Sequence, residues 1–225
     1  MDRALIVVAK RPSPGSTKTR LVPPLSPKQA ARLYRCMLLD TLEAMQQVSG
    51  VDHVVAYAPD EARAYFGDLA PSGYRLVPQS GETLGERLDT VLRAHLENGY
   101  AQAVVMNSDG PTLPIDYVQQ AFEELSKTGV DAVLGPSEDG GYYLIGLKSP
   151  CSRLFDVTMS TATVLEETLS LARELQLQTA CLPIWHDVDT PDQLQRFVRE
   201  VAELPADRVP HSRRLLGTWT QQQRL

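Results

Sequence analysis

The stretch 4-ALIVVAKRPSPGSTKTRLVPPLSPKQ-29 contains the pattern that decides the fold. Its first six residues form an apolar run rich in β-branched side chains, which is typical of a buried strand. A loop dense in Pro, Gly and Lys/Arg follows at residues 10–25. Ser26 then begins a helix, because Pro27 lies in the first turn and Gln29 completes a capping box. The order strand, basic loop, helix predicts the first unit of an α/β sheet.

The alternation of strands and helices continues along most of the chain. Apolar runs predict further strands at residues 53–58, 74–77, 103–106, 130–134, 142–147 and 179–182. Capped amphipathic segments predict helices at residues 26–48, 83–96, 115–127, 161–175 and 190–201. Strands that alternate with helices of this length predict the α/β class, with a mainly parallel sheet and helices on both faces.

Length and composition favour a single domain. The chain has 225 residues, of which 43% are hydrophobic, and this is enough for one sizeable core. We place the domain at residues 1–203 and expect the polar remainder, residues 204–225, to be a loosely packed terminus. The net charge of −6 argues against nucleic acid as the main partner, because phosphate backbones select basic surfaces.

The cysteines and the N-terminus exclude other classes of protein. Cys36, Cys151 and Cys181 lie far apart and show no CxxC spacing, so we expect neither a disulfide framework nor a zinc site. The apolar run at residues 4–9 is too short for a signal peptide or a membrane span. The sequence therefore predicts a cytoplasmic protein without a membrane span.

Four loops follow predicted strands and are rich in Asp, Lys, Arg or Gly. They lie at residues 10–25, 107–114, 135–141 and 186–190. Sheets of this kind bind ligands at the carboxyl ends of their strands, so we expect these loops to surround one site. The chain contains neither GxSxG nor GxGxxG after the first strand, which argues against a serine hydrolase and a dinucleotide-binding fold.

The first of these loops is basic. It places Lys10, Arg11, Lys18 and Arg20 around Gly15, and cations on a flexible backbone suit a phosphate chain. The loop is not a Walker sequence, which would require GxxxxGK[ST]. A solvated loop that is basic without binding phosphate is the alternative.

The second loop, 107-NSDGPTLP-114, carries a candidate metal ligand. Asp109 follows a buried strand, in a turn built by Gly110 and Pro111. Mg²⁺ in proteins takes one or two carboxylates and leaves its other positions to phosphate oxygens and water. The alternative is that Asp109 only caps the helix that begins near Ile115.

The third loop belongs to the stretch 135-GPSEDGGYYLIG-146. Asp-Gly is a common pair in hairpin turns, and one glycine would suffice for a turn. The pair Gly140 and Gly141 therefore favours a close approach by a ligand or by other backbone. We hypothesise that an acceptor lies against these glycines, with Glu138 and Asp139 at its border.

The fourth loop belongs to 186-HDVDTPDQL-194. Asp187 and Asp189 alternate, so in extended backbone they face the same side and could supply a second metal ligand. Alternatively, Asp189 only favours the start of the following helix. His186, Asp139 and Asp187 are weak candidates for a general base.

Together these motifs resemble a known family. In order and spacing, 18-KTRL-21, 108-SDGPTL-113, 135-GPSEDGGYYLIGL-147 and 187-DVDTPDQL-194 are similar to a bacterial family of GT-A-like transferases. Its members are labelled arsenosugar-biosynthesis glycosyltransferases or nucleotide-diphospho-sugar transferase-like proteins. They are related to phospholactate guanylyltransferases and molybdopterin nucleotidyltransferases. The resemblance covers about residues 4–201 and implies a Rossmann-like nucleotide-binding sheet that uses Mg²⁺ or Mn²⁺.

The resemblance implies a role for individual residues. The segment 80-SGETLGERL-88 is similar to the family's Gly-Glu-Arg segment beside the nucleotide base. The implied catalytic residues are Lys18, Asp109 and Asp139. The implied metal ligands are Asp109, Asp187 and Asp189. The implied acceptor-binding residues are Glu138, Gly140 and Gly141. The implied nucleotide-binding residues are Ala9, Lys10, Gly15, Lys18, Arg20, Gly85, Glu86, Arg87 and Ser108.

The chain departs from the family pattern at two positions. Asn107 stands where members commonly have Gly, and Ala162 stands where they commonly have an acidic residue. If that acid contacts the acceptor, the choice of acceptor differs here. The motifs for metal and phosphate are intact.

Three functions agree with these observations. The first is a metal-dependent glycosyltransferase that moves a sugar from a nucleotide-diphospho-sugar to a small acceptor. The second is a nucleotidyltransferase that joins an NTP to a small phosphorylated acid or cofactor precursor and releases pyrophosphate. The third is a non-catalytic nucleotide-binding subunit. The expected partners are thus a nucleotide sugar or NTP and a small-molecule acceptor.

Overall fold

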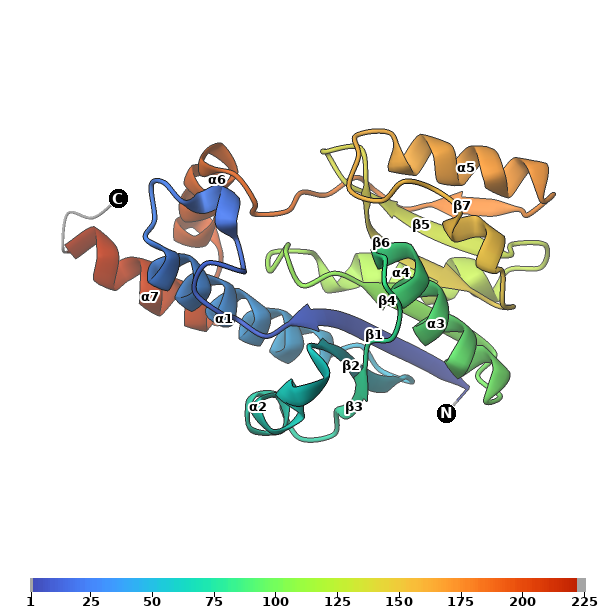
Figure 1. Ribbon diagram of the computed structural model, residues 1–225, viewed down its shortest axis with the longest axis horizontal. Coiled ribbons are helices and arrows are strands. Elements are labelled where there is room, and N and C mark those ends of the chain that lie inside the picture. The colour runs from blue at the N-terminus through green and yellow to red at the C-terminus, as the bar shows by residue number, and fades with distance from the viewer. Residues whose placement is uncertain (1, 222–225) are drawn as a thin grey trace.

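A single mixed sheet forms the centre of the computed structural model, which describes residues 2–221 (Figure 1). Its strand order within these residues is β3-β2-β1-β4-β6-β5-β7. The strands are β1 (Arg3–Lys10), β2 (Asp52–Ala58), β3 (Arg75–Pro78), β4 (Gln102–Met106), β5 (Ala132–Pro136), β6 (Tyr142–Leu147) and β7 (Thr179–Cys181). Only the pairs that β6 makes, with β4 and with β5, are antiparallel among the described strands. The predicted α/β class and the mainly parallel sheet are confirmed.

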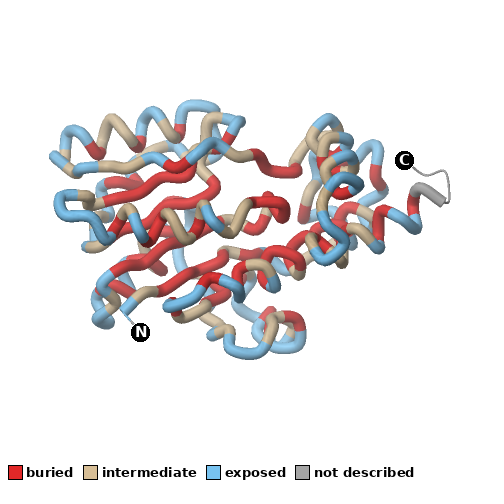
Figure 2. The backbone as a smooth tube through the Cα atoms, turned by 180° about the vertical axis from the view of Figure 1, so that it is seen from behind, coloured by how far each residue is buried: buried red, intermediate tan, exposed pale blue. Residues whose placement is uncertain are grey.

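Helices cover both faces of the sheet. They are α1 (Pro27–Met45), α2 (Arg63–Leu69), α3 (Leu84–Glu97), α4 (Ile115–Ser126), α5 (Val164–Glu174), α6 (Pro191–Glu203) and α7 (Pro210–Gln221), with short 3-10 turns at Thr19–Leu21, Asp60–Ala62 and Ser152–Phe155. Alternate side chains of β1 point to opposite faces. Leu5 and Val7 pack with α1, α2 and α4, whereas Ala4 and Ile6 pack with α3 and α5. The backbone is most deeply buried along the strands between these layers (Figure 2).

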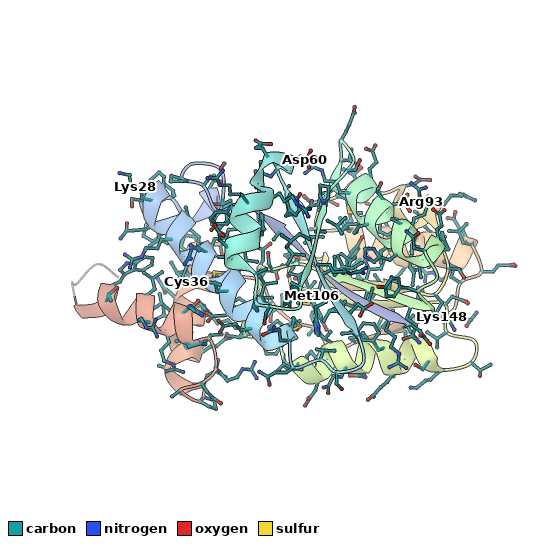
Figure 3. The ribbon with its side chains drawn as sticks, turned by 90° about the horizontal axis from the view of Figure 1, so that it is seen from below. Lys28, Cys36, Asp60, Arg93, Met106 and Lys148 are labelled. Atoms are coloured by element: carbon teal, nitrogen blue, oxygen red, sulfur yellow. The ribbon has the colours of Figure 1, made fainter. Side chains whose placement is uncertain are left out.

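The buried ends of the strands lead directly to the loops of interest. Met106, the last residue of β4, is 2% exposed and lies near the centre of the molecule, whereas Lys28, Asp60, Arg93 and Lys148 lie at its periphery (Figure 3). The loop that begins one residue later therefore starts inside the protein.

The predicted helix starts agree with the structure. Ser26 with Gln29, Thr83 with Glu86 and Thr190 with Gln193 each form the full capping box, in which side chain and backbone of both residues bond reciprocally. Within the described residues, no helix is long and apolar enough to cross a membrane.

The prediction of a loosely packed terminus is wrong for most of residues 204–225. Helix α7 packs against α1 and α6, and Leu215, Leu216 and Trp219 are buried in a third apolar cluster there. Asp40 of α1 accepts hydrogen bonds from the backbone nitrogens of His211 and Ser212 at the start of α7, at 2.8 and 2.9 Å. Residues 222–225, with Arg224, lie outside the described residues.

The antiparallel strand β6 completes the edge at which the loops meet. β5 turns through residues 137–141 into β6, so the chain arrives at the carboxyl edge and immediately returns. The start of β6 therefore lies beside the carboxyl ends of β4 and β5. This hairpin adds the Asp-Gly-Gly turn to the loops after β1, β4 and β7.

Candidate active site

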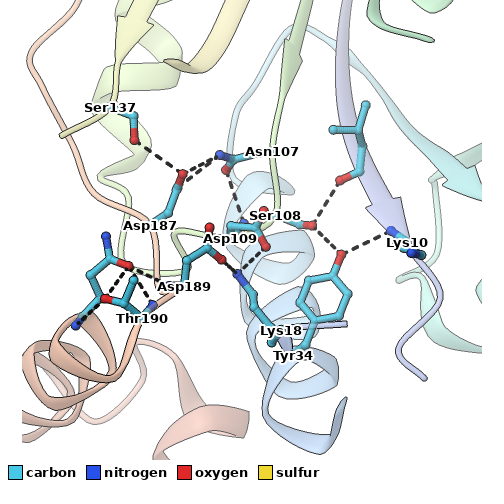
Figure 4. Close-up of polar contacts among 12 residues, drawn as sticks. Lys10, Lys18, Tyr34, Asn107, Ser108, Asp109, Ser137, Asp187, Asp189 and Thr190 are labelled. Carbon is cyan, nitrogen blue, oxygen red and sulfur yellow. Dashed lines mark hydrogen bonds and ion pairs between the residues drawn. The ribbon is translucent and has the colours of Figure 1, made fainter. Parts of the chain in front are cut away.

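Lys18 joins three loops that are far apart in the sequence (Figure 4). Its Nζ lies 2.5 Å from Asp109 Oδ1 and 2.7 Å from Asp189 Oδ1, and its side chain is 4% exposed. These residues come from the loops after β1, β4 and β7. We call this arrangement the lysine clasp. It brings together three of the four loops that we expected to surround one site.

The loop around Lys18 is shaped by its own hydrogen bonds. The Thr17 hydroxyl donates to Ser13 O at 3.1 Å and lies 3.2 Å from Ser13 N, which donates to it. Lys18 follows with φ 51° and ψ 42°, in the left-handed region, and begins the short turn Thr19–Leu21. Its ammonium lies 5.7 Å from the centre of the Tyr34 ring. The reversal of the backbone at Lys18 directs the side chain into the protein toward the carboxylates.

Tyr34 connects the first loop to the loop after β4. Its hydroxyl lies 2.9 Å from Ser108 Oγ, and Ser108 Oγ donates to Val8 O at 3.1 Å. The nitrogen of Lys10 donates to the same tyrosine oxygen at 3.2 Å. Burial, followed by the charge of Asp109, raises the pKa of Tyr34 to about 12, so the hydroxyl stays protonated. Sequence reasoning missed Tyr34 in this role, because the residue lies inside the predicted helix at residues 26–48 and not in one of the four loops.

Asp187 is a buried carboxylate beside the clasp. Asn107 Nδ2 donates to both of its oxygens at 3.1 Å, and Ser137 Oγ donates to Oδ2 at 3.4 Å. Burial raises the pKa of Asp187 to about 7, and the neighbouring charge of Asp109 adds to the rise. Asn107 also accepts from the nitrogen of Asp109 at 3.3 Å. Asn107, which replaces the glycine common in the family, thus has a side-chain amide that connects the loop after β4 to the loop after β7.

Two adjoining cavities open at this edge. The larger measures about 520 Å³, within the range of small-molecule sites. The predicted site residues that line it are Ala9, Lys10, Arg20, Arg87, Ser108, Asp109, Asp139, Gly141, Asp187 and Asp189. Its apolar wall includes Leu84, Tyr142 and Met159. The smaller cavity, about 250 Å³, is lined by Lys10, Ser16, Thr17, Lys18, Thr19, Arg20, Tyr34, Asp109 and Asp189.

Other predicted nucleotide-binding residues shape the backbone. A Cβ on Gly85 would meet Phe155 O at 3.0 Å, so this helical glycine permits close packing. The Glu86 carboxylate accepts from the nitrogen of Thr83 at 3.4 Å in the capping box, and from the nitrogen of Glu82 at 2.7 Å. Gly15 adopts φ +80° in a turn. The described residues that line the two cavities include none of these three.

The two glycines of the turn have different roles. Gly140 has φ +89°, and a Cβ there would lie 1.9 Å from Ala162 O, so the close approach comes from backbone and not from a ligand. Leu165 N donates to Gly140 O at 2.9 Å across the same contact. Gly141 meets only Asp139 Oδ1, at 3.2 Å, and lines the larger cavity. The hypothesis of an acceptor against both glycines is therefore wrong for Gly140.

Glu138 and His186 point elsewhere. Glu138 forms an ion pair with Arg196 at 2.9 Å on the surface. His186 Nε2 lies 3.0 Å from the Glu200 carboxylate and the ring is 1% exposed. Asp139 does line the cavity, and its Oδ1 accepts from the nitrogen of Gly141 at 3.0 Å. Of the predicted acceptor-binding residues and candidate bases, Gly141, Asp139 and Asp187 therefore reach the cavity.

The carboxylates of the clasp fit a divalent cation that also binds substrate phosphate. Within residues 2–221, no group of three or more His, Cys, Asp or Glu side chains has the arrangement of a metal site. Asp109 and Asp189 nevertheless turn one oxygen each toward a single cation, the ammonium of Lys18. Two carboxylates with open positions for phosphate and water suit Mg²⁺ or Mn²⁺. Asp187 differs, because Asn107 holds both of its oxygens.

Residues 41–161 match the profile of a family described as "Uncharacterized protein conserved in bacteria (DUF2064)". The chain belongs to this family. The matched segment includes Asp109 and the Asp-Gly-Gly turn of the DUF2064 protein, whereas Lys18, Asp187 and Asp189 lie outside it. The resemblance seen in the sequence motifs is thus confirmed at the level of the family.

Solved structures extend the comparison over the whole chain. A "putative nucleotide-diphospho-sugar transferase" from Desulfovibrio desulfuricans G20 is 32% identical, with 98% of this chain and 96% of that chain covered and a TM-score of 0.89. CMP:2-keto-3-deoxy-manno-octonic acid synthetase complexed with CTP is 13% identical, with 90% and 99% covered and a TM-score of 0.58. No curated protein matches the chain.

A third structure holds a metal. Rv0371c from Mycobacterium tuberculosis H37Rv, in complex with manganese, is 15% identical, with 86% of this chain and 96% of that chain covered and a TM-score of 0.51. At these identities the synthetase and Rv0371c share the fold with the DUF2064 protein. The fold is therefore that of a nucleotide-diphospho-sugar transferase.

Proposed function

We propose that the DUF2064 protein is a transferase that uses Mg²⁺ or Mn²⁺ and moves a sugar from a nucleotide-diphospho-sugar to a small acceptor. The observation that carries this proposal is the lysine clasp, where Asp109 and Asp189 converge on one cation beside Lys10 and Arg20. The name of the 32%-identical relative from Desulfovibrio desulfuricans supports the substrate class. In this proposal the protein is cytoplasmic, where its nucleotide substrates are present.

Each part of the cavity has a place in this reaction. Asp109 and Asp189 would hold the metal, and a divalent cation bound there would supply positive charge for the leaving diphosphate. Lys10 and Arg20 line both cavities and would bind phosphate oxygens. Arg87 and Leu84 would border the nucleoside.

The acceptor would enter from the side of the Asp-Gly-Gly turn. Gly141 and Tyr142 form the wall there. Asp139 keeps Oδ1 on the nitrogen of Gly141 and would accept the acceptor's proton at its other oxygen. The apolar surface of Tyr142 and Met159 would exclude water from the reacting atoms.

Ligand-dependent unfolding tests the proposal. The protein is heated with a panel of nucleotide sugars and NTPs, each with and without Mn²⁺. A ligand at a hundred times its dissociation constant stabilises the fold by about 2.7 kcal/mol. We expect a nucleotide sugar to stabilise only with metal, and the stabilising donor to release free nucleoside diphosphate when acceptors are supplied. Stabilisation without turnover of any donor would favour the non-catalytic subunit.

The smaller cavity favours a second candidate, nucleotidyl transfer. Lys10 and Arg20 line this space together with Lys18, whose ammonium is paired with Asp109 and Asp189, and the other two cations would suit the outer phosphates of an NTP. The structural likeness to the synthetase complexed with CTP agrees with this substrate. Release of pyrophosphate from an NTP, in place of nucleoside diphosphate from a nucleotide sugar, would establish this candidate and exclude the first.

A further inference from the structure

The lysine clasp places a cation where the proposed metal would bind. The ammonium of Lys18 contacts Oδ1 of Asp109 and Oδ1 of Asp189, the two carboxylates that turn toward each other. The side chain of Lys18 is 4% exposed, so its ammonium is removed from water, and the two carboxylates compensate its charge.

The backbone of Lys18 is held in an unfavourable conformation. Its φ of 51° lies in the left-handed region, which costs free energy for a residue with a Cβ. The ion pairs with Asp109 and Asp189 stabilise this conformation. Loss of these ion pairs would therefore release both the side chain and the loop.

The clasp also borders two cavities. Asp109, Asp189, Lys10, Arg20 and Tyr34 line both cavities, whereas the lining of the smaller one includes Lys18. The ammonium thus contacts two carboxylates that the cavities share. If Lys18 leaves the carboxylates, the space beside the hydroxyls of the first loop is directly available to it.

We propose that Lys18 is a built-in counter-ion, and that a divalent cation displaces it from Asp109 and Asp189. This inference rests on the proposed metal dependence of the site. A divalent cation and an ammonium repel each other strongly at a separation of a few ångström, so both cannot share these carboxylates at full strength. The displaced ammonium then faces the smaller cavity and binds phosphate oxygens of the substrate. Metal binding in this way prepares the phosphate site.

Titration with Mn²⁺ alone tests the competition. Free Mn²⁺ is measured by electron paramagnetic resonance for the wild type and for Lys18→Met, which removes the charge and keeps an apolar stem. We expect Lys18→Met to bind Mn²⁺ at least ~10-fold more tightly, because its competitor is gone. Equal or weaker binding by folded Lys18→Met would overturn the inference.

A matched variant separates competition from general charge. Lys10 lines the same cavities, but its Nζ donates to Ser16 O at 3.3 Å and not to a carboxylate. Lys10→Met should change Mn²⁺ affinity by less than ~3-fold. An increase as large as that of Lys18→Met would show that only the summed charge matters and would overturn the inference.

A measurement on the wild type does not depend on the folding of a variant. Surface labelling of lysine amines is followed by mass spectrometry with and without saturating Mn²⁺. We expect labelling of Lys18 to rise with Mn²⁺, while that of Lys127, whose side chain is 61% exposed, stays constant. Unchanged or reduced labelling of Lys18 at saturation would show that the metal does not displace it.

Failure of the metal assignment gives a different pattern. Asp109→Asn should weaken Mn²⁺ binding, because asparagine lacks the charge that holds the ion against water. If Asp109→Asn binds Mn²⁺ as the wild type does, the metal binds elsewhere. Both the proposed metal site and the counter-ion role of Lys18 are then wrong. If Asp109→Asn loses Mn²⁺ while Lys18→Met gains nothing, only the counter-ion inference fails.

Discussion

Two aspartates in different regions of the molecule are both buried. Asp40 lies on α1 under α7, and Asp187 lies in the loop after β7. Burial is the largest cause that raises the pKa of each carboxyl. Asp40 accepts from the backbone nitrogens of His211 and Ser212, which are the free donors at the start of a helix. Its surroundings explain it completely as a structural cap.

Asp187 has different neighbours. Its donors are the side chains of Asn107 and Ser137, and the charges of Asp109 and Asp189 act against its ionisation. It also lines the larger cavity. The difference teaches that burial alone does not mark a functional carboxylate. A cluster of carboxylates at an open cavity does mark a functional site, because the repulsion between the carboxylates destabilises the fold and is retained only where the site needs it.

The largest expected effect is the pH dependence that Asp187 causes. Its pKa is about 7 in the folded protein and 3.8 ordinarily, so between these values the folded state binds the proton more strongly. The unfolding free energy of the wild type should therefore fall relative to Asp187→Asn as pH rises from 4 to 7. The limit is about 4 kcal/mol, from 1.36 kcal/mol per pKa unit.

Urea unfolding of both proteins in metal-free buffer measures this difference. Subtracting the curve of Asp187→Asn cancels the carboxyl groups that do not interact with Asp187, and leaves the titration of Asp187 together with its coupling to Asp109 and Asp189. If the difference in unfolding free energy does not change with pH, the pKa of Asp187 is not raised in the folded protein. The proposed difference between Asp187 and Asp40 would then be wrong.

The next effect concerns the helix cap. Asp40→Ala should lower the unfolding free energy by about 2 kcal/mol, because two backbone nitrogens of α7 lose their acceptor. Nucleotide binding should stay within about twofold of the wild type, since Asp40 is not among the residues that line the cavities. Calorimetric titration and urea unfolding on the same sample check both. Loss of nucleotide binding at unchanged stability would mean that the two aspartates do not differ in role.

The smallest effect tests an exposed carboxylate. Glu138→Gln should change the unfolding free energy by about 0.5 kcal/mol or less, because its pair with Arg196 lies at the surface. Turnover should stay at the wild-type rate, since Glu138 is directed to α6 and not to the cavity. A clear rise in the KM for the acceptor would show that Glu138 contributes to acceptor binding.

Much of the fold could be predicted from local patterns. Capping boxes such as Ser26 with Gln29 need only four consecutive residues, and the buried strands are short apolar runs. Helix α7 was missed although Leu215, Leu216 and Trp219 recur at helical spacing. The arginines around them suggested a solvated terminus, and the cap that fixes the helix, Asp40, is more than 160 residues away.

The site could be predicted only in part, for a related reason. The rule that loops meet at the carboxyl edge brought Lys18, Asp109 and Asp189 to one place. That Lys18 would pair with carboxylates before any phosphate is present depends on its left-handed backbone, which no spacing indicates. Gly140 shows the same limit, because the Ala162 carbonyl that requires it belongs to a different loop.

Asp109 is the most direct test of metal-dependent nucleotide binding at the clasp. The affinity for the stabilising nucleotide sugar is measured with and without Mn²⁺ for the wild type, Asp109→Asn and the matched buried control Asp40→Asn, with melting curves as a check of folding. We predict that Mn²⁺ raises the affinity of the wild type and of Asp40→Asn at least ~10-fold, and that Asp109→Asn gains nothing. An undiminished gain in folded Asp109→Asn would contradict the account.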